Sequence, residues 1–173
     1  PELYASTKTI NGQRGLEAIS GKWICELEEL LATLANDYSG TKTDLAIPST
    51  VKYGIDYTVK YIGNNAFKNC SNITSVSIPY GVENIGEYAF SNCDELTSVD
   101  IPNSVDSIGK YAFNGCYRLA SVHIPHSVTS IGEYAFTNCA YLAKVNLQSP
   151  VIISNGNLKD LFGTQVTEYI IDA

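Results

Sequence analysis

The sequence predicts an α/β-type repeat solenoid with a short parallel sheet, a β-hairpin inserted in the first repeat and an N-terminal helical segment. Three observations predict this fold. An Ile-Gly pair recurs every 23 residues, at Ile62-Gly63, Ile85-Gly86, Ile108-Gly109 and Ile131-Gly132. An Ala-Phe pair and a Cys follow each Ile-Gly pair at fixed spacing, and three apolar residues spaced L-x-x-L-x-L come after the Cys. Units this small cannot bury their own apolar face, so they must stack on their neighbours.

The first predicted element of each repeat is a strand of the main sheet. Period-two alternation in the third copy turns Val99 and Ile101 inward and Ser98 and Asp100 outward. A proline follows the inward isoleucine in most copies, and a residue without an N–H fits a strand terminus. We therefore expect short parallel strands stacked along the solenoid axis.

Two further segments complete the predicted repeat. Val105 to Gly109 forms a second extended stretch on the opposite wall, where the glycine marks a turn or a close backbone approach. The Tyr-Ala-Phe-x-x-Cys segment predicts a helical turn whose Phe fills the core. Phe162 belongs to a last, degenerate copy of this turn.

Weaker copies extend the pattern at both ends, so six strands are expected on the main sheet. Leu45 to Pro48 copies the strand of the next repeat after an insertion, and Val166 to Ile171 copies the last regular strand. The insertion, residues 51–61, alternates apolar and aromatic residues on one face. This alternation predicts a hairpin that turns near Gly54.

The chain divides into two predicted parts. Residues 41–173 form the repeat domain of about five 23-residue units. Residues 1–40 do not fit the repeat and form a helical segment, with Leu27, Leu30 and Leu34 at helical spacing, that acts as a cap or is the remnant of another domain. Because the chain starts at Pro1 and has no signal segment, we expect a mature or excised piece of a longer protein.

Composition narrows the possible partners. The net charge of −7 is spread without a basic stripe, which argues against nucleic acid. No run of about 18 apolar residues exists, so no membrane span is expected.

The aligned cysteines predict a buried column and no cofactor or metal site. They are Cys70, Cys93, Cys116 and Cys139. A spacing of 23 residues distributes them along the axis, whereas a tetrahedral zinc site needs four ligands around one point. Cys25 lies outside the column, so the odd count does not imply a disulfide framework.

The outward strand positions predict a binding face in two rows. The rows are Ser75, Ser98, Ser121 and Lys144, and Ser77, Asp100, His123 and Asn146. Asp100 and His123 are expected to be lateral neighbours with Ser98 and Ser121 nearby. A flat sheet nevertheless offers no oxyanion pocket, so no catalytic residue is predicted.

A column of tyrosines, Tyr88, Tyr111 and Tyr134, leaves two alternatives open. The rings pack on one another along the stack, or they offer a rigid amphipathic area to a partner. The two alternatives are compatible.

The pattern I-P-x-x-V-x-x-I-G-x-x-A-F-x-x-C-x-x-L-x-x-V-x-I-P over residues 43–173 resembles the BspA-like leucine-rich repeats of bacteria. This resemblance implies a right-handed leucine-rich-repeat solenoid, an extracellular or cell-surface location, and a non-enzymatic module that recognises a protein or a glycan as a monomer or as part of a longer array. Ser104 and Ser127 stand where other leucine-rich repeats carry an Asn ladder, so the Cys column is expected to replace that ladder.

Residues 10–30 also resemble a short segment of virulence-associated E-type ATPases of phages and plasmids. The resemblance implies a metal-coordinating acid at Glu26, with Glu29 beside it. The segment from Gly15 to Trp23 misses the phosphate-loop pattern by one residue of spacing and by its final Trp. A fragment of such an ATPase fused to a repeat tail, or a structural spacer, remains the alternative to a recognition module.

Overall fold

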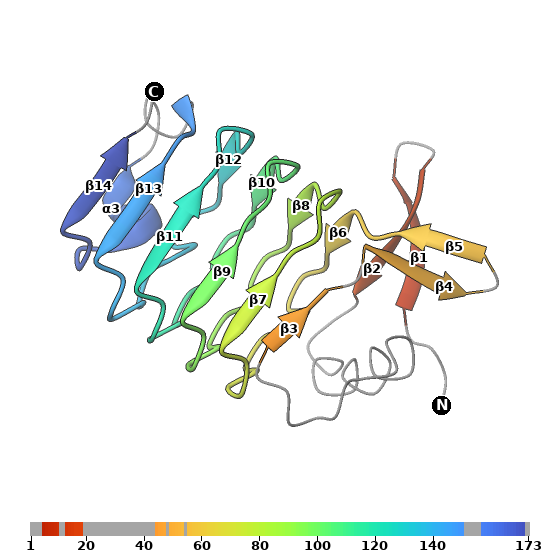
Figure 1. The fold of residues 1–173 in the computed structure, drawn as a ribbon, viewed down its shortest axis with the longest axis horizontal. Coiled ribbons are helices and arrows are strands. Elements are labelled where there is room, and N and C mark those ends of the chain that lie inside the picture. Colours follow the sequence, from red (N-terminus) through yellow and green to blue (C-terminus); the bar gives the residue numbers. More distant parts are fainter. Residues whose placement is uncertain are drawn as a thin grey trace.

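The computed structural model describes residues 5–10, 13–18, 44–47, 49–53, 55–150 and 157–171. These residues form a β-solenoid of about five turns whose strands follow one another along a single axis (Figure 1). Each coil passes through the main sheet, a second sheet and a turn segment before it returns to the main sheet.

All six predicted main-sheet strands are present. They are β3 (Asp44–Ala46), β7 (Ser75–Ser77), β9 (Ser98–Asp100), β11 (Ser121–Ile124), β13 (Lys144–Leu147) and β14 (Glu168–Ile171). They form two three-stranded parallel sheets, β3-β7-β9 and β11-β13-β14, and not the single sheet that the sequence predicted. Val99 of β9 is only partly buried, whereas Val122 of β11 is buried. Between β9 and β11, both within the described residues, no backbone hydrogen bond forms.

The second extended stretch of each repeat forms a continuous four-stranded parallel sheet. Its strands are β6 (Tyr61–Ile62), β8 (Asn84–Ile85), β10 (Ser107–Ile108) and β12 (Ser130–Ile131). Each strand ends at the isoleucine of the Ile-Gly pair, and a Cβ on the glycine that follows β10, Gly109, would lie 2.6 Å from the backbone nitrogen of Glu87. The predicted close backbone approach is confirmed.

The Tyr-Ala-Phe-x-x-Cys segments form a third wall, which we call the turn wall. It comprises residues 64–69, 87–92, 110–115 and 133–138, each folded as a turn. Within one copy, the Ala89 N–H donates to the carbonyl of Gly86 at 3.3 Å. Between copies, the Phe90 N–H donates to the carbonyl of Ala112 at 2.7 Å. The turn wall is therefore a hydrogen-bonded ladder along the axis, and α3 (Leu158–Phe162) continues it at the C-terminal end.

The core confirms the predicted inward columns. Phe67, Phe90, Phe113, Phe136 and Phe162 are buried and stack face to face, with successive ring centroids 4.9–5.3 Å apart. Tyr169 of β14 ends this row by meeting the Phe162 ring edge-on at 6.1 Å. One spine of aromatic rings thus runs through every regular coil.

Two hairpins lie at the N-terminal end of the solenoid. The predicted insertion forms the antiparallel pair β4 (Thr50–Tyr53) and β5 (Ile55–Thr58), whose register pairs Tyr53 with Ile55. A second pair, β1 (Ala5–Ile10) and β2 (Gln13–Ala18), was not predicted, and β2 lies beside β5 and β6 (Figure 1). The predicted helix with Leu27, Leu30 and Leu34 lies outside the described residues, as does the predicted turn residue Gly54. In the part of the chain that the structure describes, no helix is long and apolar enough to cross a membrane.

Candidate functional site

The outward side chains of the main-sheet strands form the sheet face, where the sequence predicted binding. The parallel register aligns them in the predicted rows by pairing Ser75 with Ser98, Ser77 with Asp100, Ser121 with Lys144, and His123 with Asn146. The alternation that exposes these residues buries the apolar residues between them, such as Val76 and Val145. The sheet face is therefore polar throughout its regular coils.

The ends of the sheet face are internally paired, and its middle is not. At one end Ser75 donates a hydrogen bond to the carboxylate of Asp44, and at the other Lys144 forms an ion pair with Glu168 at 3.6 Å. Asp100 and His123 lie between them, on the two strands that flank the interruption of the main sheet. Among the described residues neither side chain forms a hydrogen bond or an ion pair. No Ser-His-Asp relay is assembled from Ser98, His123 and Asp100.

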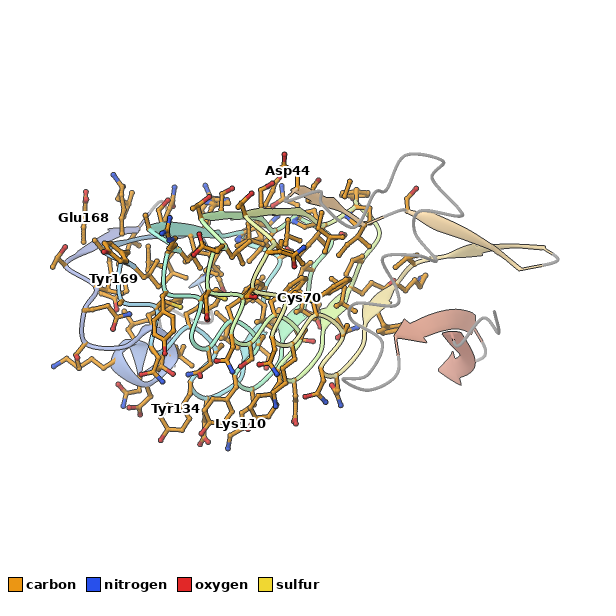
Figure 2. The ribbon with its side chains drawn as sticks, turned by 90° about the horizontal axis from the view of Figure 1, so that it is seen from below. Asp44, Cys70, Lys110, Tyr134, Glu168 and Tyr169 are labelled. Atoms are coloured by element: carbon orange, nitrogen blue, oxygen red, sulfur yellow. The ribbon has the colours of Figure 1, made fainter. Side chains whose placement is uncertain are left out.

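The tyrosine column, which we call the Tyr ladder, consists of Tyr88, Tyr111 and Tyr134. Ring centroids of neighbours lie 4.9 and 5.2 Å apart with interplanar angles of 14° and 23°, so the predicted packing of the rings on one another is confirmed. The ammonium of Lys68 lies 4.7 Å from the Tyr88 ring centroid, which is cation–π distance. Figure 2 shows Tyr134 on the opposite side of the solenoid from Asp44 and Glu168. The sheet face and the Tyr ladder therefore face in opposite directions.

The backbone of the Tyr ladder is left-handed, which the sequence did not predict. Tyr88, Tyr111 and Tyr134 have φ of 54°, 55° and 60°, values that bulky residues rarely adopt. Asn65 fills the same position in the preceding coil at φ 60°. This backbone lets the Tyr111 N–H donate to the Glu133 carbonyl of the next coil at 3.1 Å. The coil requires the left-handed conformation there, but it does not require tyrosine.

We expect Tyr111→Asn to change stability by less than about 1 kcal/mol. Asparagine tolerates this φ, which relieves strain of roughly 1–3 kcal/mol, while the loss of two ring contacts costs about 0.5–1.5 kcal/mol each. Tyr111→Val loses the same contacts and places a β-branched residue at positive φ. Valine should therefore be about 2 kcal/mol less stable than asparagine in chemical denaturation. Equal stabilities of the two variants would contradict the left-handed assignment.

The column of aligned cysteines is buried and replaces an Asn ladder, as predicted. Each of the last three thiols donates to the carbonyl of the Phe one coil earlier, from Cys93 to Phe67 at 3.1 Å and from Cys116 to Phe90 at 3.2 Å. Ser104 and Ser127 donate separate hydrogen bonds to the carbonyls of Val82 and Val105 in the preceding coil, each at 2.8 Å. Burial raises the pKa of Cys93 to about 12. No cluster of three His, Cys, Asp or Glu side chains among the described residues could hold a metal ion.

We expect the four ladder cysteines to alkylate slowly in the native state. A pKa of about 12 in place of 9.0 lowers the thiolate fraction of Cys93 near pH 8 by about a thousandfold, and burial blocks access as well. Below pH 12 the native rate should keep rising with pH instead of levelling off near 9. Mass spectrometry after timed iodoacetamide treatment, with urea-unfolded protein as the control, measures the ratio. Native labelling as fast as in urea would contradict the buried column.

The structure also exposes a group of residues that the sequence did not single out. Tyr117 and Tyr141 are 49% and 70% exposed and lie on neighbouring coils, where the Tyr141 N–H donates to the Tyr117 carbonyl at 3.1 Å. Arg118 forms an ion pair with Glu95 of the preceding coil at 3.3 Å. The available signal was the appearance of tyrosine in columns that hold charged residues in the coil before, with Asp94 preceding Tyr117 and Arg118 preceding Tyr141.

Few residues of the predicted N-terminal segment are among those that the structure describes. Cys25, Glu26 and Glu29 lie outside the described residues. Residues 13–18, part of the segment that resembles an ATPase, form strand β2.

Comparison with known proteins identifies the fold and the family. A family model described as a BspA type leucine rich repeat region, in six copies, matches residues 46–159. A leucine-rich repeat protein from Bacteroides capillosus is 22% identical with a TM-score of 0.60, covering 95% of this chain and 91% of that one. The Treponema pallidum leucine rich repeat protein is 20% identical with a TM-score of 0.55, covering 99% and 84%. No curated protein matches the chain. By its repeats and their arrangement, the chain belongs to the BspA-type leucine-rich repeat family.

Proposed function

We propose that this chain is the non-catalytic recognition module of a bacterial, surface-associated protein, and that it binds a protein or a glycan through the sheet face. Membership of the BspA-type family supports a module built for recognition or scaffolding. Repeat solenoids offer extended surfaces of this kind to partners.

The observation that carries the proposal is the contrast between the two sides of the main sheet. Inward positions hold the same kind of side chain in each coil, as in Val76, Val122 and Val145. The outward row beside them changes from coil to coil, through Ser77, Asp100, His123 and Asn146. Stacking requires the first set to be uniform, but it places no such demand on the second. Chemical variety on a fixed scaffold supports a surface that serves binding.

The middle strands of the sheet face carry polar groups that have no internal partner. Asp100 and His123 have no partner among the described residues, and the Oδ1 atom of Asn146 is buried without a hydrogen-bond partner there. A buried acceptor that lacks a partner costs about 1–3 kcal/mol, and a ligand that supplies a donor would recover it. The sheet face carries little net charge, so we expect modest affinity per module and a gain from repetition along a longer array.

We expect the triple change of Asp100, His123 and Lys144 to Ala to weaken binding at least about tenfold, equivalent to about 1.4 kcal/mol, without altering the fold. Wild type and variant are compared on one array of glycans and immobilised extracellular proteins, with circular dichroism as the check on folding. Ser130→Ala, a small change at an exposed position of β12 in the second sheet and away from the sheet face, is the control. Retained binding in the triple variant, together with loss in Tyr111→Ala, would move the binding surface to the Tyr ladder and contradict the proposal.

A further inference from the structure

Five residues lie at the edge of the main sheet where strands β9, β11 and β13 begin, and we call this group the corner patch. Its members are Asp94, Glu95, Tyr117, Arg118 and Tyr141. The backbone hydrogen bond between Tyr141 and Tyr117 and the ion pair between Arg118 and Glu95 connect three consecutive coils. Ser121 and Lys144, which open the first outward row of β11 and β13, follow within four residues of the two tyrosines. The corner patch is thus continuous with the sheet face.

Stability does not account for the tyrosines of the corner patch. Tyr141 is 70% exposed, so its ring removes little apolar area from water. Ala140 and Arg118 occupy the columns of Tyr117 and Tyr141 in the neighbouring coils, and the backbone there is equally regular. Exposed rings on consecutive coils provide a rigid amphipathic area at small entropic cost to a ligand that stacks on them.

An unsatisfied acceptor belongs to Asp94, which occupies the position of Tyr117 in the preceding coil. The Oδ1 atom of Asp94 is buried and has no hydrogen-bond partner in the described part of the chain. Asp94 directly precedes Glu95, whose carboxylate is held by Arg118 at 3.3 Å. Carboxylates that accept and a guanidinium that donates, at positions that adjoin the two exposed tyrosines along the chain and between coils, suit a ligand rich in hydroxyl groups.

The net charge of the corner patch and the small number of exposed apolar side chains favour an uncharged ligand among those rich in hydroxyl groups. Asp94, Glu95 and Arg118 together carry one net negative charge, within a chain of net charge −7, which disfavours sulfated or carboxylated ligands. Among the residues whose side chains the structure describes, the large exposed hydrophobic ones are four tyrosines and Ile171. A protein interface would require a core with more apolar area than this.

From this geometry we propose that the corner patch binds a neutral oligosaccharide, with sugar rings stacked on Tyr117 and Tyr141 and hydroxyl groups bonded to Asp94, Glu95 and Arg118. This inference rests on the proposed recognition function and names its ligand class. The oligosaccharide continues from the corner patch onto the serines of the sheet face.

Isothermal titration of the whole chain with neutral hexasaccharides tests the inference, using cellohexaose, maltohexaose, mannohexaose and chitohexaose, and a heparin hexasaccharide as the anionic comparison. We expect at least one neutral sugar to bind, and Tyr141→Ala and Tyr117→Ala each to weaken it at least about tenfold. Asp94→Asn should also weaken sugar binding, because the amide keeps only one acceptor oxygen in place of the two of the carboxylate. Tyr80→Ala is the matched control, since Tyr80 is 78% exposed and follows β7 at the opposite edge of the sheet.

Three results would overturn the inference. They are the absence of heat with every neutral sugar, unchanged affinity in both corner variants, and tighter binding of the heparin fragment. A different result would separate the two proposals. If an immobilised protein binds the wild-type chain, the triple sheet-face variant loses this binding and no sugar binds, the proposed function stands and the glycan assignment is wrong.

Discussion

Replacing Phe113 by Ala should destabilise the fold by about 3–5 kcal/mol. The side chain is fully buried and its ring stacks on Phe90 at 5.1 Å and on Phe136 at 4.9 Å. Its removal leaves a cavity in the middle of the aromatic spine that two rigid coils cannot close. In a solenoid each coil is held by its neighbours, so the loss should loosen the coils on both sides.

Thermal and urea unfolding of Phe113→Ala measure this loss, and amide exchange locates it. The matched control is Tyr141→Ala, an aromatic truncation on a side chain that is 70% exposed, for which we expect a change within about 0.5 kcal/mol. If the Phe113 and Tyr141 variants unfolded at the same temperature and urea concentration, the aromatic spine would not be the main source of stability.

Replacing Gly109 by Ala should cost about 1–3 kcal/mol, and more if neither backbone can shift. The added Cβ would lie 2.6 Å from the nitrogen of Glu87 and 2.6 Å from the carbonyl carbon of Gly86, both on the preceding coil. The clash is with backbone, so no side-chain rotation relieves it. The added Cβ would also distort the hydrogen bond that the Gly109 N–H donates to the Ile85 carbonyl at 2.8 Å.

Denaturant unfolding of Gly109→Ala provides the measurement. Asn103→Ala, a change on an exposed turn residue of the same coil, is the control and should stay within about 0.5 kcal/mol of wild type. A Gly109 variant as stable as this control would show that the coils tolerate a wider spacing than the second sheet suggests.

The walls of the solenoid and its inward columns could be predicted because stacking repeats the same requirement at every coil. Val122 and Phe113 recur at the 23-residue step because each must fill the same space as its copy one coil away. Register is then fixed by the period itself. The Gly column was open to the same reasoning, since two backbones meet at each copy.

The remaining features depend on contacts between particular coils, which a period does not encode. The interruption between β9 and β11 separates two strands whose sequences fit the repeat equally well. Left-handed tyrosines contradict residue preference, although Asn69, Asn92 and Asn138, with φ of 57–65°, do follow it and could have marked the turn wall. The β1–β2 hairpin had a signal that was missed, because Asn-Gly stands between Ile10 and Gln13, which pair across it.

Tension applied along the solenoid axis would load every junction between coils in series. The β3–β7 and β7–β9 junctions resist through hydrogen bonds of the main sheet, the second sheet and the turn wall, whereas the β9–β11 junction has only the last two. We therefore expect the β9–β11 junction to open before the two junctions that precede it, while β3-β7-β9 and β11-β13-β14 each stay together as a three-stranded sheet. Asp100 and His123 lie on the two sides of this junction, so a ligand that contacted both would resist its opening.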